Sequence, residues 1–184
     1  LETRQNLKLR RRWADLLPSI PEGENYLWHT DRKGGLPLFG WRTRYWSFLL
    51  KLSKKLPSWT IQAQPGSAIG PFHWSNRKLS WQEMAAIQTF PKTFVIDAPR
   101  TEVQRQIGNA VPSLIAEILA RQISAQVFDK HITGQPALSV SRCGTIPEPE
   151  SIEPVPAKYM CLVGEHEAHP GTGKGNSYKT GTDG

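Results

Sequence analysis

The sequence contains few of the residues that build several common classes of protein. Only two cysteines, Cys143 and Cys161, occur in 184 residues, so at most one disulfide bond can form. This count excludes a disulfide-rich scaffold, and two thiols make no structural zinc site without histidine, so we expect no metal. No apolar run approaches the ~20 residues that cross a bilayer, so we expect no membrane partner.

The chain also lacks an initiator methionine and a secretory signal. It begins at Leu1, and its first methionine is Met84, which indicates a fragment of a longer protein or a non-standard start. Three consecutive arginines at 10–12 lead into no apolar segment of the kind that a signal peptide contains. We therefore expect a cytoplasmic protein whose length allows one ordinary domain and a tail.

Positive charge is concentrated in the first third of the chain. Residues 1–57 carry 12 basic and 5 acidic side chains, whereas residues 129–184 carry 5 and 7, and all seven tryptophans lie between Trp13 and Trp81. Such a segment suits a nucleic acid, because cations neutralise phosphates and aromatic rings stack on bases. The alternative is a solvated basic face over a Trp-rich core, and composition leaves both open.

Two helices are well marked in the sequence. Ser80 and Glu83 have the spacing of a capping box, with Leu79 and Met84 placed as a hydrophobic staple, so a helix should start there and end before Pro91. A second helix should follow Pro112 and continue to about residue 127. Its apolar residues recur on one face: Leu114, Ile115, Ile118, Leu119 and Ile123.

The remaining segments carry weaker patterns. Apolar spacing predicts a helix over residues 45–55, and alternation predicts a half-buried strand over residues 59–64. Residues 129–184 hold 6 prolines and 8 glycines without a sustained apolar period, which predicts a flexible tail.

Two sequence blocks in this order resemble the DNA cytosine-5 methyltransferases. Residues 77–91 are similar to that family's ninth conserved motif, with Arg77, Leu79, Ser80 and Glu83 followed by Gln-Thr-Phe-Pro. Residues 106–112, Gln-Ile-Gly-Asn-Ala-Val-Pro, are similar to its tenth and last motif. The resemblance extends over roughly residues 14–127 and implies the C-terminal portion of such an enzyme.

Several parts that this family needs have no counterpart here. The family's nucleophile is a cysteine after a proline, but Cys143 follows Arg142 and Cys161 follows Met160. The Gly-rich cofactor loop, the Glu-Asn-Val triplet and the Gln-x-Arg-x-Arg strand are also missing. We therefore expect no catalytic residue in this chain and no methyl transfer by the chain alone.

The resemblance implies roles for five residues. Asn109 and Ala110 would approach the methionine part of S-adenosylmethionine, in a pocket that this chain supplies only in part. Arg42, Arg44 and Arg77 would contact DNA. The alternatives are that residues 108–109 are a turn before a core helix, that the arginines are surface residues, and that Arg77 braces the recognition region.

The expected architecture is mixed α/β. It has a connecting segment (1–17), a target-recognition region of short strands and loops (18–76), two motif helices that complete a Rossmann-like methyltransferase domain (77–128), and a disordered tail (129–184). The expected partners are double-stranded DNA and a missing N-terminal catalytic half or subunit, within a restriction-modification system. The main alternative is a stand-alone DNA-binding module, and a basic RNA-binding protein is a weaker one.

Overall fold

The computed structural model describes residues 7, 13–41, 46–139 and 144–167. It contains three α-helices, α1 (Trp81–Ile87), α2 (Arg100–Asn109) and α3 (Ser113–Phe128). Three 3-10 helices accompany them: η1 (Ala14–Ser19), η2 (Tyr26–His29) and η3 (Ala157–Leu162). Within these residues, β structure is limited to three isolated bridges, so the short strands that we expected are not formed.

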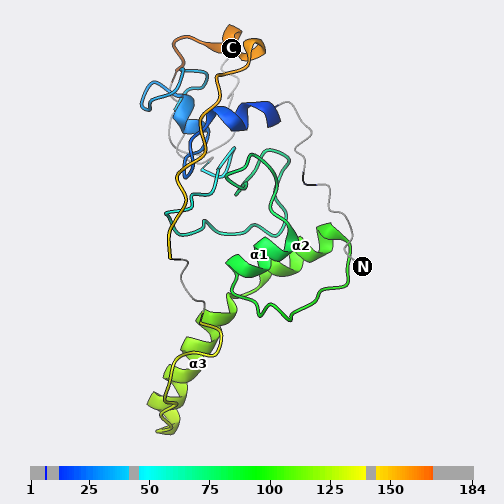
Figure 1. Cartoon of the computed structure of the whole chain (residues 1–184), viewed down its shortest axis with the longest axis vertical. Helices are drawn as coiled ribbons and strands as arrows, with labels where there is room; N and C mark the ends of the chain where they lie inside the picture. The colour runs from blue at the N-terminus through cyan, green and yellow to red at the C-terminus, as the bar shows by residue number, and fades with distance from the viewer. Residues whose placement is uncertain (1–6, 8–12, 42–45, 140–143, 168–184) are drawn as a thin grey trace, which may run out of the picture.

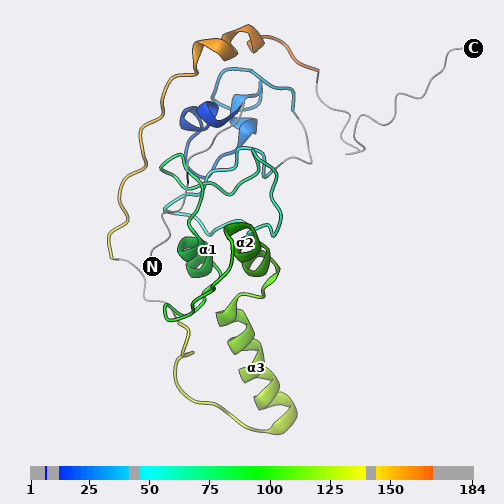
Figure 2. The same cartoon turned by 90° about the vertical axis from the view of Figure 1, so that its right-hand side faces the viewer.

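The elements are arranged in tiers along one axis (Figures 1 and 2). The three 3-10 helices gather at one end, the loops of residues 46–75 lie below them, and α1 and α2 lie side by side in the next tier. Helix α3 projects away at the opposite end, so most of its surface has no neighbour in the fold.

The predicted recognition region is built around a core of aliphatic and aromatic side chains rather than a sheet. Its buried members include Leu16, Leu27, Leu49 and Phe72, and Tyr159 joins them from the C-terminal part of the chain. The tryptophans are divided between the core and the surface. Trp13, Trp28 and Trp41 pack partly buried against this cluster, Trp74 and Trp81 pack against a second one, and Trp46 and Trp59 are about half exposed.

Neither weak secondary-structure prediction of the middle segment is correct. Residues 46–55 form no helix, because several of their amides bond to distant carbonyls: Leu49 to Ala68 and Leu52 to Phe72, each at 2.8 Å. Residues 49–52 are all buried, whereas an amphipathic helix buries only one face. Residues 59–64 pair with no strand, and of their alternating side chains only Ile61 is fully buried.

Helix α1 is confirmed together with its capping box. The Ser80 hydroxyl accepts the Glu83 amide at 3.2 Å, and the Glu83 carboxylate accepts the Ser80 amide at 2.7 Å. Leu79 and Met84 are both buried in the second hydrophobic cluster, as the staple predicted. The helix ends at Ile87 with Gln88 as its C-cap, close to the expected end.

Helix α2 was not predicted. It begins after Pro99 and buries Val103 and Ile107 in the same cluster as Met84 of α1. Gly108 and Asn109 form its last turn, so the alternative of a simple turn at these positions is also wrong. Polar residues dominate the helix, and only two of its ten side chains are buried, which hides its periodicity.

Helix α3 is confirmed, but its apolar face is exposed. No residue of α3 is buried, and Ile115, Ile118, Leu119 and Ile123 are between 42% and 54% exposed. Asp129 ends the helix in the left-handed conformation, at φ 52°. The chain then turns back, and the Glu117 carboxylate accepts the amides of residues 137 and 138 at 2.7 and 2.9 Å.

The expectation of a disordered tail needs correction for residues 144–167. This segment runs back along the molecule and ends in η3, beside η1 and η2 (Figures 1 and 2). Tyr159 stacks on Trp13 at 5.4 Å and donates to the Asp15 carboxylate at 2.7 Å. The burial of Tyr159 thus holds this segment against the core, although its Pro-rich composition predicted disorder. No helix among the described residues is long and apolar enough to span a membrane.

Candidate functional site

The two motif segments meet in space at the ends of α1 and α2. The Gln88 side chain donates to the Ile107 carbonyl at 3.0 Å, and the backbone carbonyl of Gln88 accepts the Ser113 amide at 3.0 Å. The Thr89 hydroxyl accepts the Leu114 amide at 2.8 Å. The C-terminal end of α1 therefore orients both the last turn of α2 and the first turn of α3.

Helix α2 is also pressed against residues 62–63 through Gly108. A Cβ atom at this position would lie 2.5 Å from the Ala63 Cα and 2.7 Å from the Gln62 carbonyl carbon. Because real Cβ atoms show no such distances, only glycine allows the helix to come so close. Gln104, one turn earlier, donates to the Gln62 carbonyl at 3.3 Å.

Arg77 forms a two-pronged ion pair with Glu83 of α1. Its two terminal nitrogens lie 2.8 and 2.7 Å from the two carboxylate oxygens. Arg77, helped by the Ser80 amide and opposed by burial, lowers the pKa of Glu83 to about 2. His73 lies 3.6 Å from the same carboxylate, and burial, together with the charge of Arg77, lowers its pKa. Arg77 is thus engaged inside the fold, and its contact with DNA stays a prediction.

A cavity of about 740 Å³ lies between residues 61–72 and the helices α1 and α2. Residues 61–67 form one wall, and Arg100, Thr101 and Gln104 of α2 contribute to the other. Arg100 donates to the Leu79 carbonyl at 2.6 Å, so its guanidinium helps to tie α2 to the capping box. The cavity marks where the two parts of the chain face each other.

The predicted cofactor residues lie at the end of α2. Asn109 is exposed, so its side-chain amide is able to donate to a carboxylate or accept from an ammonium group. The Ala110 amide donates to the Ile107 carbonyl at 3.2 Å. Because the first two amides of α3 also have partners in Gln88 and Thr89, these residues fit only one edge of a cofactor site.

The predicted DNA contacts Arg42 and Arg44 lie outside the described residues, but their neighbours do not. Trp41 and Trp46, which flank residues 42–45, contact each other edge to face at 6.3 Å. The structure also points to Arg32, which pattern analysis did not single out. Its guanidinium carbon lies 4.7 Å from the centre of the Trp41 ring, a contact between residues nine positions apart that no local sequence signal indicates.

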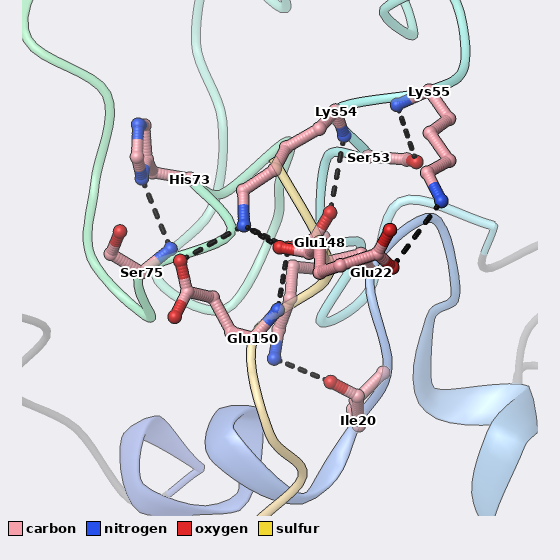
Figure 3. A network of polar contacts seen from close by, with 10 residues as sticks. Ile20, Glu22, Ser53, Lys54, Lys55, His73, Ser75, Glu148 and Glu150 are labelled. Atoms are coloured by element: carbon pink, nitrogen blue, oxygen red, sulfur yellow. Dashed lines mark hydrogen bonds and ion pairs between the residues drawn. The ribbon is translucent and has the colours of Figure 1, made fainter. Parts of the chain in front are cut away.

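Some cations of the basic segment are used inside the molecule. Lys54 lies between the carboxylates of Glu22 and Glu150, at 3.0 and 2.9 Å, and donates to the Glu148 carbonyl at 2.7 Å (Figure 3). Lys51 is buried, donates to the Ile20 carbonyl, and burial lowers its pKa to about 8. Both lysines are thus engaged within the molecule, Lys54 in ion pairs and Lys51 in a hydrogen bond to a backbone carbonyl.

The described residues hold no cluster of three or more histidine, cysteine or acidic side chains able to bind a metal ion. Cys161 is exposed in η3, at the end of the molecule remote from the motif helices, and Cys143 lies outside the described residues (Figure 1). Cys161 stands in no group of described histidine or acidic side chains of the kind that activates a thiol.

Comparison with known proteins identifies the family. The model of the C-5 cytosine-specific DNA methylases matches residues 30–125. The type II methyltransferase M.SacI of Streptomyces achromogenes is 47% identical over 125 residues, covering 62% of this chain and 32% of that protein. M.NgoFVII of Neisseria gonorrhoeae is 34% identical over 120 residues, covering 64% and 30%.

A third relative, the DNA (cytosine-5-)-methyltransferase M.ApeKI of Aeropyrum pernix, is 36% identical over 75 residues, covering 40% of this chain and 16% of that protein. No solved structure is significantly similar to the chain. The chain spans about a third of the length of the first two of these relatives. Since the family match covers more than half of its 184 residues, the chain belongs to the C-5 cytosine-specific DNA methylase family.

Proposed function

We propose that this chain is the DNA-recognition and cofactor-closing portion of a cytosine-5 DNA methyltransferase of a restriction-modification system. Its substrate would be double-stranded DNA in the cytoplasm. The nucleophilic cysteine and most of the cofactor pocket would come from a catalytic part outside this chain. The observation that carries the proposal is the junction of α1, α2 and α3, where the two family-like motifs interlock through Gln88 and Thr89.

In this proposal the chain contributes contacts to the cofactor and to DNA, and the catalytic part outside the chain contributes the chemistry. Asn109 and Ala110 would form one edge of the S-adenosylmethionine site, and the helices would complete a Rossmann-like domain. When bound, S-adenosylmethionine supplies the methyl group that is transferred to C5 of cytosine. A methyltransferase must also take its target base out of the duplex, which needs a recognition surface and phosphate anchors. Arg42, Arg44 and Arg77 are the proposed anchors.

The exposed face of α3 favours a catalytic partner over a stand-alone DNA-binding module. Ile115, Ile118, Leu119 and Ile123 form one apolar stripe that nothing in the described chain covers. A contiguous apolar patch of this kind on a monomer marks an interaction site. The stripe continues directly from the tenth-motif residues, so a partner bound there would also lie beside Asn109.

The proposal is tested by supplying the missing part in trans. M.SacI lacking the segment that matches this chain is mixed with the full 184-residue chain, S-adenosylmethionine carrying a radioactive methyl group, and plasmid DNA. Methyl transfer well above that of either polypeptide alone supports the proposal. Specific DNA binding by the chain alone, as a monomer and without any gain in methyl transfer, supports the DNA-binding module instead.

The matched control is the same chain with Ile118→Glu, which places a charge within the stripe of α3. This substitution should abolish the gain in methyl transfer, because a carboxylate buried against the partner is costly. Ala120→Glu, at an exposed position on the side of the same helix opposite Ile118, should leave the gain intact.

A further inference from the structure

The loop of residues 30–36, here named the Arg32 loop, is held rigidly against the aromatic core. The Thr30 hydroxyl donates to the Leu27 carbonyl at 2.7 Å, and the Gly35 amide donates to the Trp28 carbonyl at 3.0 Å. Thr30 is itself buried. A Cβ atom on Gly35 would lie 2.7 Å from the Trp28 ring, so the backbone of the loop packs directly against that indole. These contacts fix the backbone of the loop on both sides of Arg32.

Arg32 stands exposed on this fixed loop with its guanidinium stacked on Trp41. The distance from the guanidinium carbon to the ring centre is 4.7 Å, within the range of cation–π contacts. Trp41 is in turn braced edge to face by Trp46 at 6.3 Å. The indole therefore holds the guanidinium carbon over its ring face, and this contact uses none of the five N–H donors of the guanidinium.

Arg32 differs from its neighbour Lys33 in that Lys33 forms an ion pair within the described chain. Lys33 is paired with the Glu24 carboxylate at 3.0 Å. No carboxylate in the part of the chain that the structure describes pairs with the Arg32 guanidinium. Asp31, the preceding residue, is exposed. A carboxylate at this position repels phosphate, so the site suits a base edge better than the DNA backbone.

We infer that Arg32 is a specificity-determining residue that recognises a guanine of the target sequence in the major groove. The inference rests on the proposed function and deepens it, because it names one base that the recognition region reads. A planar guanidinium donates two parallel hydrogen bonds to O6 and N7 of guanine, which no other base pair accepts in the same pattern. Holding the guanidinium on Trp41 before DNA arrives lowers the entropic cost of forming this pair.

The experiment selects sequences from a randomised duplex library with the full 184-residue chain and then measures affinities. The wild type should enrich a site that contains an invariant guanine. Arg32→Lys keeps the charge but loses the planar pair of donors, so discrimination at that one position should fall by roughly 5- to 150-fold. Preferences at the other positions and binding to unrelated duplex DNA should change little.

Arg105→Lys is the matched control, because Arg105 is also exposed but is paired with Glu102 on α2. It should leave all base preferences unchanged. Thermal unfolding followed by circular dichroism should be the same for both variants, which excludes a general loss of fold. Trp41→Leu should reproduce part of the Arg32→Lys effect, since it removes the ring on which the guanidinium lies.

The outcomes separate this inference from the proposed function. If the wild type selects a sequence and Arg32→Lys keeps every preference, the assignment of Arg32 is overturned while DNA recognition by the chain stands. A uniform loss of affinity on all duplexes would make Arg32 a phosphate contact and likewise overturn the assignment. If the wild type binds no DNA at all, both the assignment and the proposed recognition role are contradicted.

Discussion

The guanidinium of Arg77 grips the carboxylate of Glu83 with two hydrogen bonds of 2.8 and 2.7 Å. Glu83 also closes the capping box of α1 through the Ser80 amide, so one carboxylate ties the chain that enters α1 to the first turn of the helix. Arginine is suited to this task because its planar fork matches both oxygens, which an ammonium group does not.

Arg77→Lys should therefore lower the free energy of unfolding by about 1 kcal/mol, the scale expected for a partly exposed ion pair with good geometry. Urea unfolding of the full chain measures the change. The control is Arg105→Lys, whose exposed pair with Glu102 lies within α2 and joins no two parts of the fold. Equal losses in the two variants would contradict the bridging role of Arg77.

Acidification should weaken the same junction. The pKa of Glu83 is lowered from 4.5 to about 2, so the stabilisation by this carboxylate is complete above pH 4.5 and is lost as the pH falls towards 2. After allowance for solvent screening, the loss should be about 1–2 kcal/mol. Glu83→Gln should be less stable at pH 7 and less dependent on pH between 4.5 and 2. An unchanged pH profile in this variant would contradict the assignment.

Sequence patterns predicted best those elements whose position depends on residues close together in the chain. The capping box between Ser80 and Glu83 fixes the start of α1 within four residues of chain, and the apolar stripe of α3 follows from its own spacing. Helix α2 escaped prediction because its position depends on Gly108 approaching the backbone of Ala63, a contact that no pattern within α2 contains.

The predictions for the middle segment and the tail were wrong for a related reason. Around Leu49, amides bond to carbonyls about twenty residues away, and all side chains of residues 49–52 are buried, so neither helical nor strand periodicity applies. Tyr159 is one aromatic residue in a Pro-rich segment, yet it docks on Trp13 across more than 140 positions. The contact of Arg32 with Trp41 is likewise tertiary, so the spacing of residues in the sequence did not predict it.

Gly108 should tolerate no side chain. Gly108→Ala places a methyl group 2.5 Å from the Ala63 Cα, and the resulting overpacking should cost about 1–3 kcal/mol, although alanine favours a helix by ~1 kcal/mol. Thermal unfolding measures the effect. Gly144→Ala, where a Cβ would meet nothing within 4 Å, should leave stability unchanged. A Gly108→Ala variant more stable than the wild type would show that α2 is not pressed on this segment.

Tyr159 should act as the anchor of the C-terminal segment. It is 4% exposed, so Tyr159→Ala should destabilise the chain by about 3 kcal/mol, while Tyr159→Phe should lose only the bond to Asp15, about 1 kcal/mol. Met160→Ala is the control, because Met160 is 48% exposed in the same 3-10 helix. Urea unfolding distinguishes them, and equal stabilities of Tyr159→Ala and Met160→Ala would contradict the packed segment.

Methyl transfer reconstituted in trans tests the central claim most directly. The full chain is added to M.SacI lacking the matching segment, and methylated cytosines in plasmid DNA are mapped by bisulfite sequencing. The account predicts 5-methylcytosine at one recurrent sequence only when both polypeptides are present, and none with either alone or with Ile118→Glu. Methylation by the 184-residue chain alone, or none in the mixture although the two polypeptides form a complex, would contradict it.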